Sequence, residues 1–156
     1  MLDGSVEKHK AHFVAKRFSQ KEGIGFEETF ALVARYTLVK ALIAIEAAKG
    51  WKIHQMDVKT AFLNGILEEE VYLEQPKGFV SHDFFSYVFK LKKALHGLKQ
   101  APPVWYERID KYLLSLGFSK NDADPNLYFK VTKGDMLILI LYVDDLLIIG
   151  EGCLIN

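Results

Sequence analysis

Three aspartates carry the chemistry that this sequence suggests. Asp144 and Asp145 interrupt the apolar run Ile138–Gly150, and Asp57 ends a predicted strand far upstream. Adjacent buried carboxylates repel each other unless solvent or a cation compensates them. Two interpretations stay open: a solvated hairpin turn with Asp144 and Asp145 as its two central residues, or a site for hard cations. If the two strands are neighbours in one sheet, the three carboxylates converge where two Mg²⁺ ions could support in-line phosphoryl transfer.

A second candidate segment, Lys90–Tyr106, contains bases but no acid. Gly97 permits close backbone approach, Gln100 offers a side-chain donor, and Pro102-Pro103 leads into a predicted helix. One interpretation is a solvated basic loop. The other is a segment that contacts phosphates or bases. Its lysines are Lys90, Lys92, Lys93 and Lys99.

Composition indicates one packed domain. The chain has 156 residues, of which 50% are hydrophobic and 13% aromatic, and its formal net charge is zero. Cys153 is the single cysteine, so an internal disulfide is impossible, and we expect an intracellular compartment, cytoplasmic or nuclear. The longest apolar run, Met136–Val143, is far shorter than the roughly 20 residues that span a bilayer, so no membrane partner is expected.

Hydrophobic periodicity predicts strands interleaved with two helices. Thr37 should cap a helix over 38–49 that ends at Gly50 and has a broad buried face including Ile43. A second helix is predicted over 104–116, followed by Gly117. Strands are predicted over 9–18, 51–57, 70–74, 87–91, 127–132, 136–143 and 146–149. This order indicates an α+β fold with a mainly antiparallel sheet packed on two helices.

Five ordered blocks resemble the reverse transcriptase domain of copia-type LTR retrotransposons, part of their Pol polyprotein. The blocks are "VAKRFSQKEGIGFEETFALVARYT", "GWKIHQMDVKTAFLNGILEEEVYLEQPKGF", "LKKALHGLKQAPPVWYERI", "DADPNLYF" and "LYVDDLLIIG". The resemblance implies a single domain over 1–156. A polymerase palm would occupy 51–150, partial fingers and the first palm helix would occupy about 9–50, and a thumb would be absent.

The resemblance also implies roles for individual residues. Asp57, Asp144 and Asp145 would be the catalytic aspartates and, with the carbonyl of Val58, would hold two Mg²⁺ ions, with Mn²⁺ as a substitute. Phe62 would pack under the nucleotide sugar and exclude a 2′-hydroxyl. The other residues expected to contact the nucleotide or the primer–template are Gly97, Leu98, Lys99, Gln100, Tyr142 and Val143. The implied reaction is RNA-directed DNA synthesis, and the implied partners are an RNA or DNA template with primer and dNTPs.

Five positions depart from the family pattern. His12 and Pro103 stand where the family has arginine, and histidine lacks arginine's five fixed donors. Arg17, Leu32 and His96 replace a glycine, a proline and a tyrosine. With the expected lack of a thumb, these differences favour a truncated or degenerate copy.

Two alternatives to a polymerase stay open. One is a catalytically inactive remnant that binds nucleic acid through the basic segment in a salt-sensitive way. The other is a small ferredoxin-like RNA-binding domain, which is disfavoured because acids would face the RNA. We also expect self-association through uncovered apolar surface, with "MLILILYV" at a sheet edge.

Overall fold

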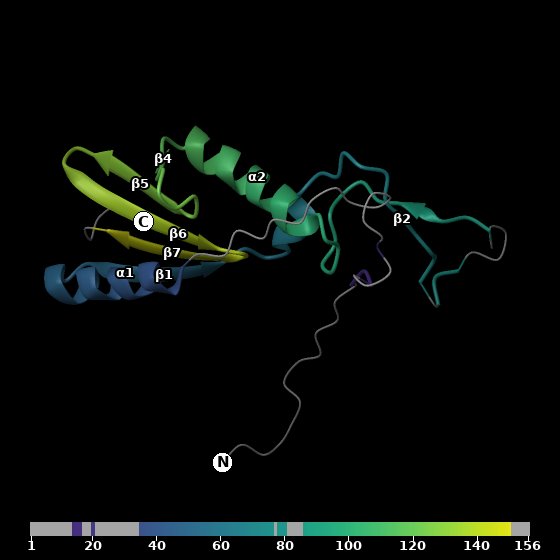
Figure 1. Ribbon diagram of the computed structural model, residues 1–156, viewed down its shortest axis with the longest axis horizontal. Coiled ribbons are helices and arrows are strands. Elements are labelled where there is room, and N and C mark those ends of the chain that lie inside the picture. Colours follow the sequence, from purple (N-terminus) through teal and green to yellow (C-terminus); the bar gives the residue numbers. More distant parts are fainter. Residues whose placement is uncertain (1–13, 17–19, 21–34, 77, 81–85, 151–156) are drawn as a thin grey trace, which may run out of the picture.

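The computed structural model describes residues 14–16, 20, 35–76, 78–80 and 86–150. Within them a five-stranded antiparallel sheet has the order β1-β7-β6-β5-β4. Two helices cover its opposite faces (Figure 1). The α+β prediction is therefore confirmed. The strands are β1 (Lys52–Asp57), β4 (Ser119–Lys120), β5 (Leu127–Thr132), β6 (Asp135–Tyr142) and β7 (Asp145–Gly150).

Alternation along β6 explains why both faces of the sheet are covered. Leu139 and Leu141 pack on the α2 side, whereas Ile140 packs on the α1 side with Leu42. Because successive strand residues point to opposite faces, an almost wholly apolar strand suits a position between two layers. The expectation that "MLILILYV" lies at a sheet edge is wrong, since β6 lies between β7 and β5 and the edges are β1 and β4.

Helix α1 spans Tyr36–Lys49 and begins earlier than predicted. Arg35 occupies the N-cap position, so the prediction that Thr37 caps the helix is wrong. Gly50 ends it with φ 67°, and its N–H donates to the Glu46 carbonyl at 2.7 Å. The buried face is narrower than predicted: Leu42 is the one buried residue of this helix, Leu38 and Ile45 pack partly buried beside it, and Ile43 is 52% exposed.

Helix α2 spans Ala101–Ser115 and also begins earlier than the predicted residue 104. Pro102 and Pro103 fit its first turn because N–H groups there have no partner within the helix. Its buried residues recur at helical spacing and are Ala101, Trp105, Ile109 and Leu113. The last three pack against β5, β6 and β7, whereas Ala101 packs in a separate cluster with Leu98.

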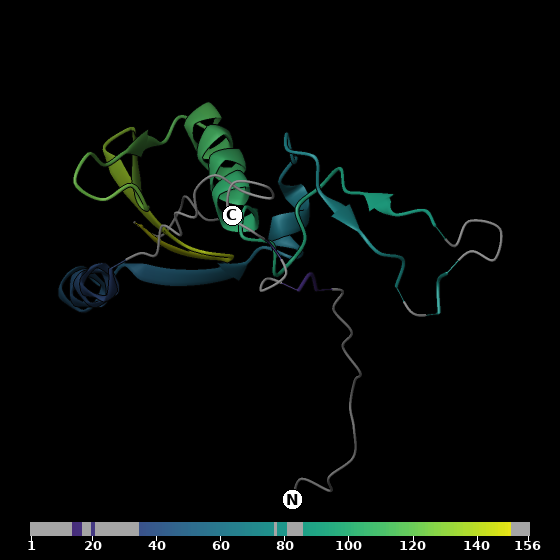
Figure 2. The same ribbon diagram turned by 45° about the vertical axis from the view of Figure 1, so that its right-hand side comes forward.

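A smaller unit projects from the end of the main sheet. It holds the 3₁₀ turn η2 (Ala61–Asn64) and a two-stranded sheet of β2 (Tyr72–Leu73) and β3 (Phe89–Lys90), seen on the right of Figure 2. The strands predicted over 70–74 and 87–91 are thus present but shorter. This unit has its own core, made of Ala15, Leu67, Val71, Ala94, Leu98 and Ala101.

Some predictions fall outside the described residues. Of the strand predicted over 9–18, only 14–16 are described, and they form no strand, although the Ala15 N–H donates to the His96 carbonyl at 2.8 Å. His12, Arg17, Leu32 and Cys153 are not described. Among the described residues, no helix is long and apolar enough to cross a bilayer.

Candidate active site

The three aspartates lie at the same end of the main sheet. Strands β1 and β7 are neighbours, with Asp57 opposite Asp145, and β6 places Tyr142 opposite Asp145 on the other side. Directly paired residues share a face of the sheet. The side chains of Asp57, Asp145 and Tyr142 therefore form one row across three strands. The row lies at the end of the sheet nearest the β2–β3 unit (Figure 1).

The turn between β6 and β7 differs from the predicted one. Its central residues are Val143 and Asp144, because Tyr142 pairs with Asp145. The expectation of Asp144 and Asp145 at the two central positions is therefore wrong. Val143 has φ 56°, and Asp144 is not among the described residues with positive φ. That pattern is typical of a type II′ turn, which favours glycine at its first central position, so a β-branched residue there is strained.

Both central carbonyls of this turn are bonded to other elements. The Trp105 Nε1–H of α2 donates to the Val143 carbonyl at 2.6 Å. The Val58 N–H, just past β1, donates to the Asp144 carbonyl at 2.8 Å. The sequence places Trp105 on one side of the helix predicted over 104–116, with other apolar residues, and assigns its N–H no partner. The available signal was that a buried indole N–H usually needs a partner.

The carboxylates themselves are reachable from solvent. Asp57 is exposed, and Asp144 and Asp145 are half-buried. Gln55, two residues before Asp57 on the same face of β1, donates its Nε2–H to Asp145 Oδ1 at 3.3 Å. Gln55 is a second residue that sequence reasoning missed.

The donor chemistry suits a hard cation, but the side chains are not gathered into a cage. Carboxylate and carbonyl oxygens are the ligands that Mg²⁺ takes. Within the described part of the chain, no three His, Cys, Asp or Glu side chains are arranged to hold a metal ion. The backbone pairing thus brings Asp57, Asp144 and Asp145 together, whereas their side chains do not converge on one point.

Phe62 connects this site with the smaller unit. It lies in η2 and packs against two buried clusters. One is the cluster between α2 and the main sheet that contains Trp105, and the other is the core of the smaller unit, which contains Leu98. Its ring is 5.2 Å from that of His96, centroid to centroid, at an interplanar angle of 57°. His96 is therefore an aromatic neighbour of Phe62.

The segment around Gly97 is held by contacts within the protein. Gly97 has φ 94°, and a Cβ there would lie 2.2 Å from the Ala15 carbonyl oxygen. Gln100, expected at the nucleotide, is only 4% exposed. Its Nε2–H donates to Glu69 and its Oε1 accepts from Gln20, both at 2.8 Å. The Lys99 N–H also donates to Gln20 Oε1 at 2.8 Å.

The basic segment is partly neutralised. Lys90 forms a hydrogen-bonded ion pair with Glu70, which also accepts a hydrogen bond from the Tyr72 hydroxyl at 3.0 Å. The bond from Lys90, and then that from Tyr72, lowers the pKa of the Glu70 carboxyl. Lys92 and Lys93 are exposed.

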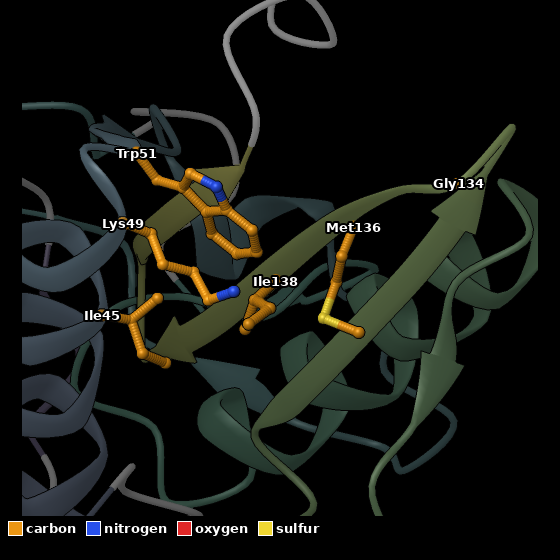
Figure 3. A pocket seen from close by; sticks show the side chains of 6 residues that line it. All are labelled: Ile45, Lys49, Trp51, Gly134, Met136 and Ile138. Carbon is orange, nitrogen blue, oxygen red and sulfur yellow. The ribbon is translucent and has the colours of Figure 1, made fainter.

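A shallow pocket of about 510 Å³ lies at the other end of the sheet (Figure 3). The ring of Trp51 faces it, with Lys49 Nζ 5.3 Å from the ring centroid. It is lined by Ile45, Lys49, Trp51, Gly134, Met136 and Ile138, so it is remote from the row of aspartates.

Comparison with known proteins agrees with the residue-level resemblance. Residues 2–155 match the family model of the reverse transcriptase (RNA-dependent DNA polymerase). The chain is 41% identical over 149 residues to the retrovirus-related Pol polyprotein from transposon RE1 of Arabidopsis thaliana. The match covers 96% of this chain and 10% of that protein. It is 44% identical over 150 residues to the Pol polyprotein from transposon TNT 1-94 of Nicotiana tabacum, covering 96% of this chain and 11% of that protein.

A yeast relative matches a shorter part. The putative transposon Ty5-1 protein YCL074W of Saccharomyces cerevisiae is 43% identical over 93 residues, which are 60% of this chain and 30% of that protein. No solved structure matches the chain significantly. The chain spans about a tenth of the length of the plant polyproteins. It belongs to the reverse transcriptase (RNA-dependent DNA polymerase) family, in the form found in the Pol polyproteins of copia-type retrotransposons.

Proposed function

We propose that this chain forms the catalytic core of an RNA-directed DNA polymerase that extends a primer on an RNA or DNA template with dNTPs. The observation that carries the proposal is the register of β1, β7 and β6. It places Asp57 opposite Asp145 at the end of the sheet, beside the turn that holds Asp144. Two carboxylates directly opposite each other on neighbouring strands destabilise a sheet, so their pairing favours a role with a cation.

Asp57, Asp144, Asp145 and the Val58 carbonyl are the groups that would hold Mg²⁺, or Mn²⁺ in its place. Two bound ions supply alignment of the attacking hydroxyl and charge stabilisation at the leaving pyrophosphate. Because the backbones of the three aspartates are already adjacent, a change of side-chain rotamer is the smallest movement that gathers their oxygens.

The remaining roles concern the nucleic acid. Tyr142 is 43% exposed in the same row as Asp145, which supports contact between Tyr142, Val143 and the primer end. Phe62 is half-buried on η2 and would limit the space for a 2′-hydroxyl. Residues 51–150 would be the palm and 9–50 part of the fingers. Gln100 would orient this region through Gln20 and Glu69 rather than meet the nucleotide in the arrangement described.

Primer extension on an RNA template tests the proposal. Asp144→Asn should abolish Mg²⁺-dependent incorporation because it removes a charged oxygen ligand. Asp135→Asn is the matched control, since Asp135 is an acid at the far end of β6, the strand that leads into the turn with Asp144. Incorporation that is lost in both variants, or in neither, would contradict the proposal.

A second candidate is nucleic-acid binding without catalysis. It is favoured by the exposure of Lys92 and Lys93 in a stretch that contains no acid from residue 86 to 106. Binding through phosphate contacts should weaken as salt increases and should not need Mg²⁺. Salt-sensitive binding together with no incorporation in the wild-type chain would favour this candidate over the polymerase.

A further inference from the structure

Trp105 is a buried residue whose one polar atom is used at the site. The residue is 4% exposed and belongs to the buried cluster that also contains Ile109, Leu141 and Leu146. The indole N–H is directed out of this apolar cluster to the Val143 carbonyl, 2.6 Å away. A phenylalanine could fill most of this volume, so the bond distinguishes tryptophan from an ordinary core residue.

The bond is made at a strained position of the backbone. Val143 is β-branched and has φ 56°, a conformation that such residues adopt only when the surroundings impose it. Of the two central residues in this turn, Val143 is the one held by a side chain, while the Val58 N–H holds the carbonyl of Asp144. The strained turn is therefore fixed from helix α2 on one side and from the end of β1 on the other.

We propose that Trp105 is a positioning residue: its indole N–H holds the Val143–Asp144 turn in the strained form and so sets the direction of the Asp144 carboxylate. Without the bond, the turn is free to relax toward conformations that valine prefers, and these carry Asp144 away from the row formed by Asp57 and Asp145. The consequence for catalysis rests on the proposed polymerase function, whereas the effect on the turn does not.

The first measurement concerns the turn alone. Trp105→Phe removes the donor and keeps an aromatic ring in the core. Tyr106→Phe is the matched control, because its hydroxyl donates to a different carbonyl, that of Pro125, also at 2.6 Å and from the same helix. We expect amide exchange at 143–146 to quicken about tenfold in Trp105→Phe and to stay unchanged in Tyr106→Phe, on the usual strength of such a bond. Equal exchange at the turn in the two variants would overturn the proposal.

An isosteric replacement covers the case in which Trp105→Phe fails to fold. In a Trp51→Phe background, position 105 is the only tryptophan, because the chain has two. Benzothienylalanine there keeps the shape of the indole but has sulfur in place of the N–H, and 7-azatryptophan keeps the N–H. Fast exchange at the turn with the first analogue and wild-type exchange with the second is expected. Slow exchange with both would overturn the proposal.

The second measurement addresses catalysis. In primer extension, Trp105→Phe should lower kcat about tenfold and raise the Mg²⁺ concentration at half-maximal rate, with little change in KM for dNTP. Tyr106→Phe should leave all three unchanged. A raised KM with normal kcat would contradict the positioning role. If the wild-type chain incorporates no nucleotide, the polymerase proposal fails, and the exchange data still decide whether Trp105 holds the turn.

Discussion

Replacing Gly97 with alanine should destabilise the chain more than the same change at Gly134. The two glycines have nearly equal φ, 94° and 95°, so an added Cβ strains both backbones alike, by about 1–2 kcal/mol. Nothing lies within 4 Å of a Cβ at Gly134, whereas at Gly97 it would lie 2.2 Å from the Ala15 carbonyl oxygen. Relief of that clash requires local repacking, or detachment of 14–16 with loss of the bond from Ala15 to His96. Either route adds about 1–3 kcal/mol.

Urea unfolding of the two variants gives the comparison, with Gly134→Ala as the control for backbone strain. We expect unfolding free energies lowered by about 1–2 kcal/mol for Gly134→Ala and by about 2–5 kcal/mol for Gly97→Ala. Amide exchange at Ala15 should quicken only in Gly97→Ala, because its N–H bonds to the His96 carbonyl. Equal destabilisation by the two changes, with unaltered exchange at Ala15, would refute the packing of 14–16 on the Gly97 segment.

Three further predictions concern the core and the surface. Burial, and then the hydrogen bond to Asp110, raise the pKa of Tyr128 above its ordinary 10.0. As the pH rises, the unfolded chain therefore loses the phenolic proton of Tyr128 before the folded chain does. The unfolding free energy should fall by up to about 1.4 kcal/mol per pH unit above pH 10. Tyr128→Phe should remove that part of the slope in urea titrations from pH 9 to 11, and an unchanged slope would contradict it. Leu42→Ala should lower the unfolding free energy by about 2–5 kcal/mol, because Leu42 is 3% exposed. Ile43→Ala, at a site that is 52% exposed, should change the unfolding free energy by less than about 0.5 kcal/mol. Similar losses of unfolding free energy in the two variants would contradict the packing of α1. Self-association is expected through the exposed face of α1 that carries Tyr36 (74% exposed) and Ile43. Sedimentation velocity should show weaker self-association in Ile43→Lys than in the wild type. A wild-type chain that stays monomeric at high concentration would contradict the prediction.

The elements that follow a strong local pattern were predictable from the sequence. Trp105, Ile109 and Leu113 recur at helical spacing and do form the buried face of α2. The strands predicted over 127–132 and 136–143 match β5 and β6 within one residue at each end. Helix α1 was predictable in extent but not in burial, because a helix with apolar residues on every side does not reveal which side packs. Strand β4 has two residues and no periodicity to detect.

The geometry of the aspartate turn was not predictable by local rules. Those rules disfavour valine at positive φ, so they direct the turn away from Val143, where the structure has it. Pairing of Tyr142 with Asp145, and bonds from Trp105 and Val58, override that preference. Such tertiary contacts are not encoded in spacing, and strained positions that the rest of the fold imposes tend to occur at functional sites.

Mn²⁺ binding tests the central claim, that the aspartates at the shared end of β1 and β7 form one cation centre. Mn²⁺ would be titrated into the whole chain and its free fraction followed by electron paramagnetic resonance, for the wild type, Asp57→Asn and Asp135→Asn. We predict at least about tenfold weaker binding in Asp57→Asn, because even residues outside the ligand shell affect affinity by that much. Asp135→Asn should bind like the wild type. Equal affinity in all three chains would contradict the claim.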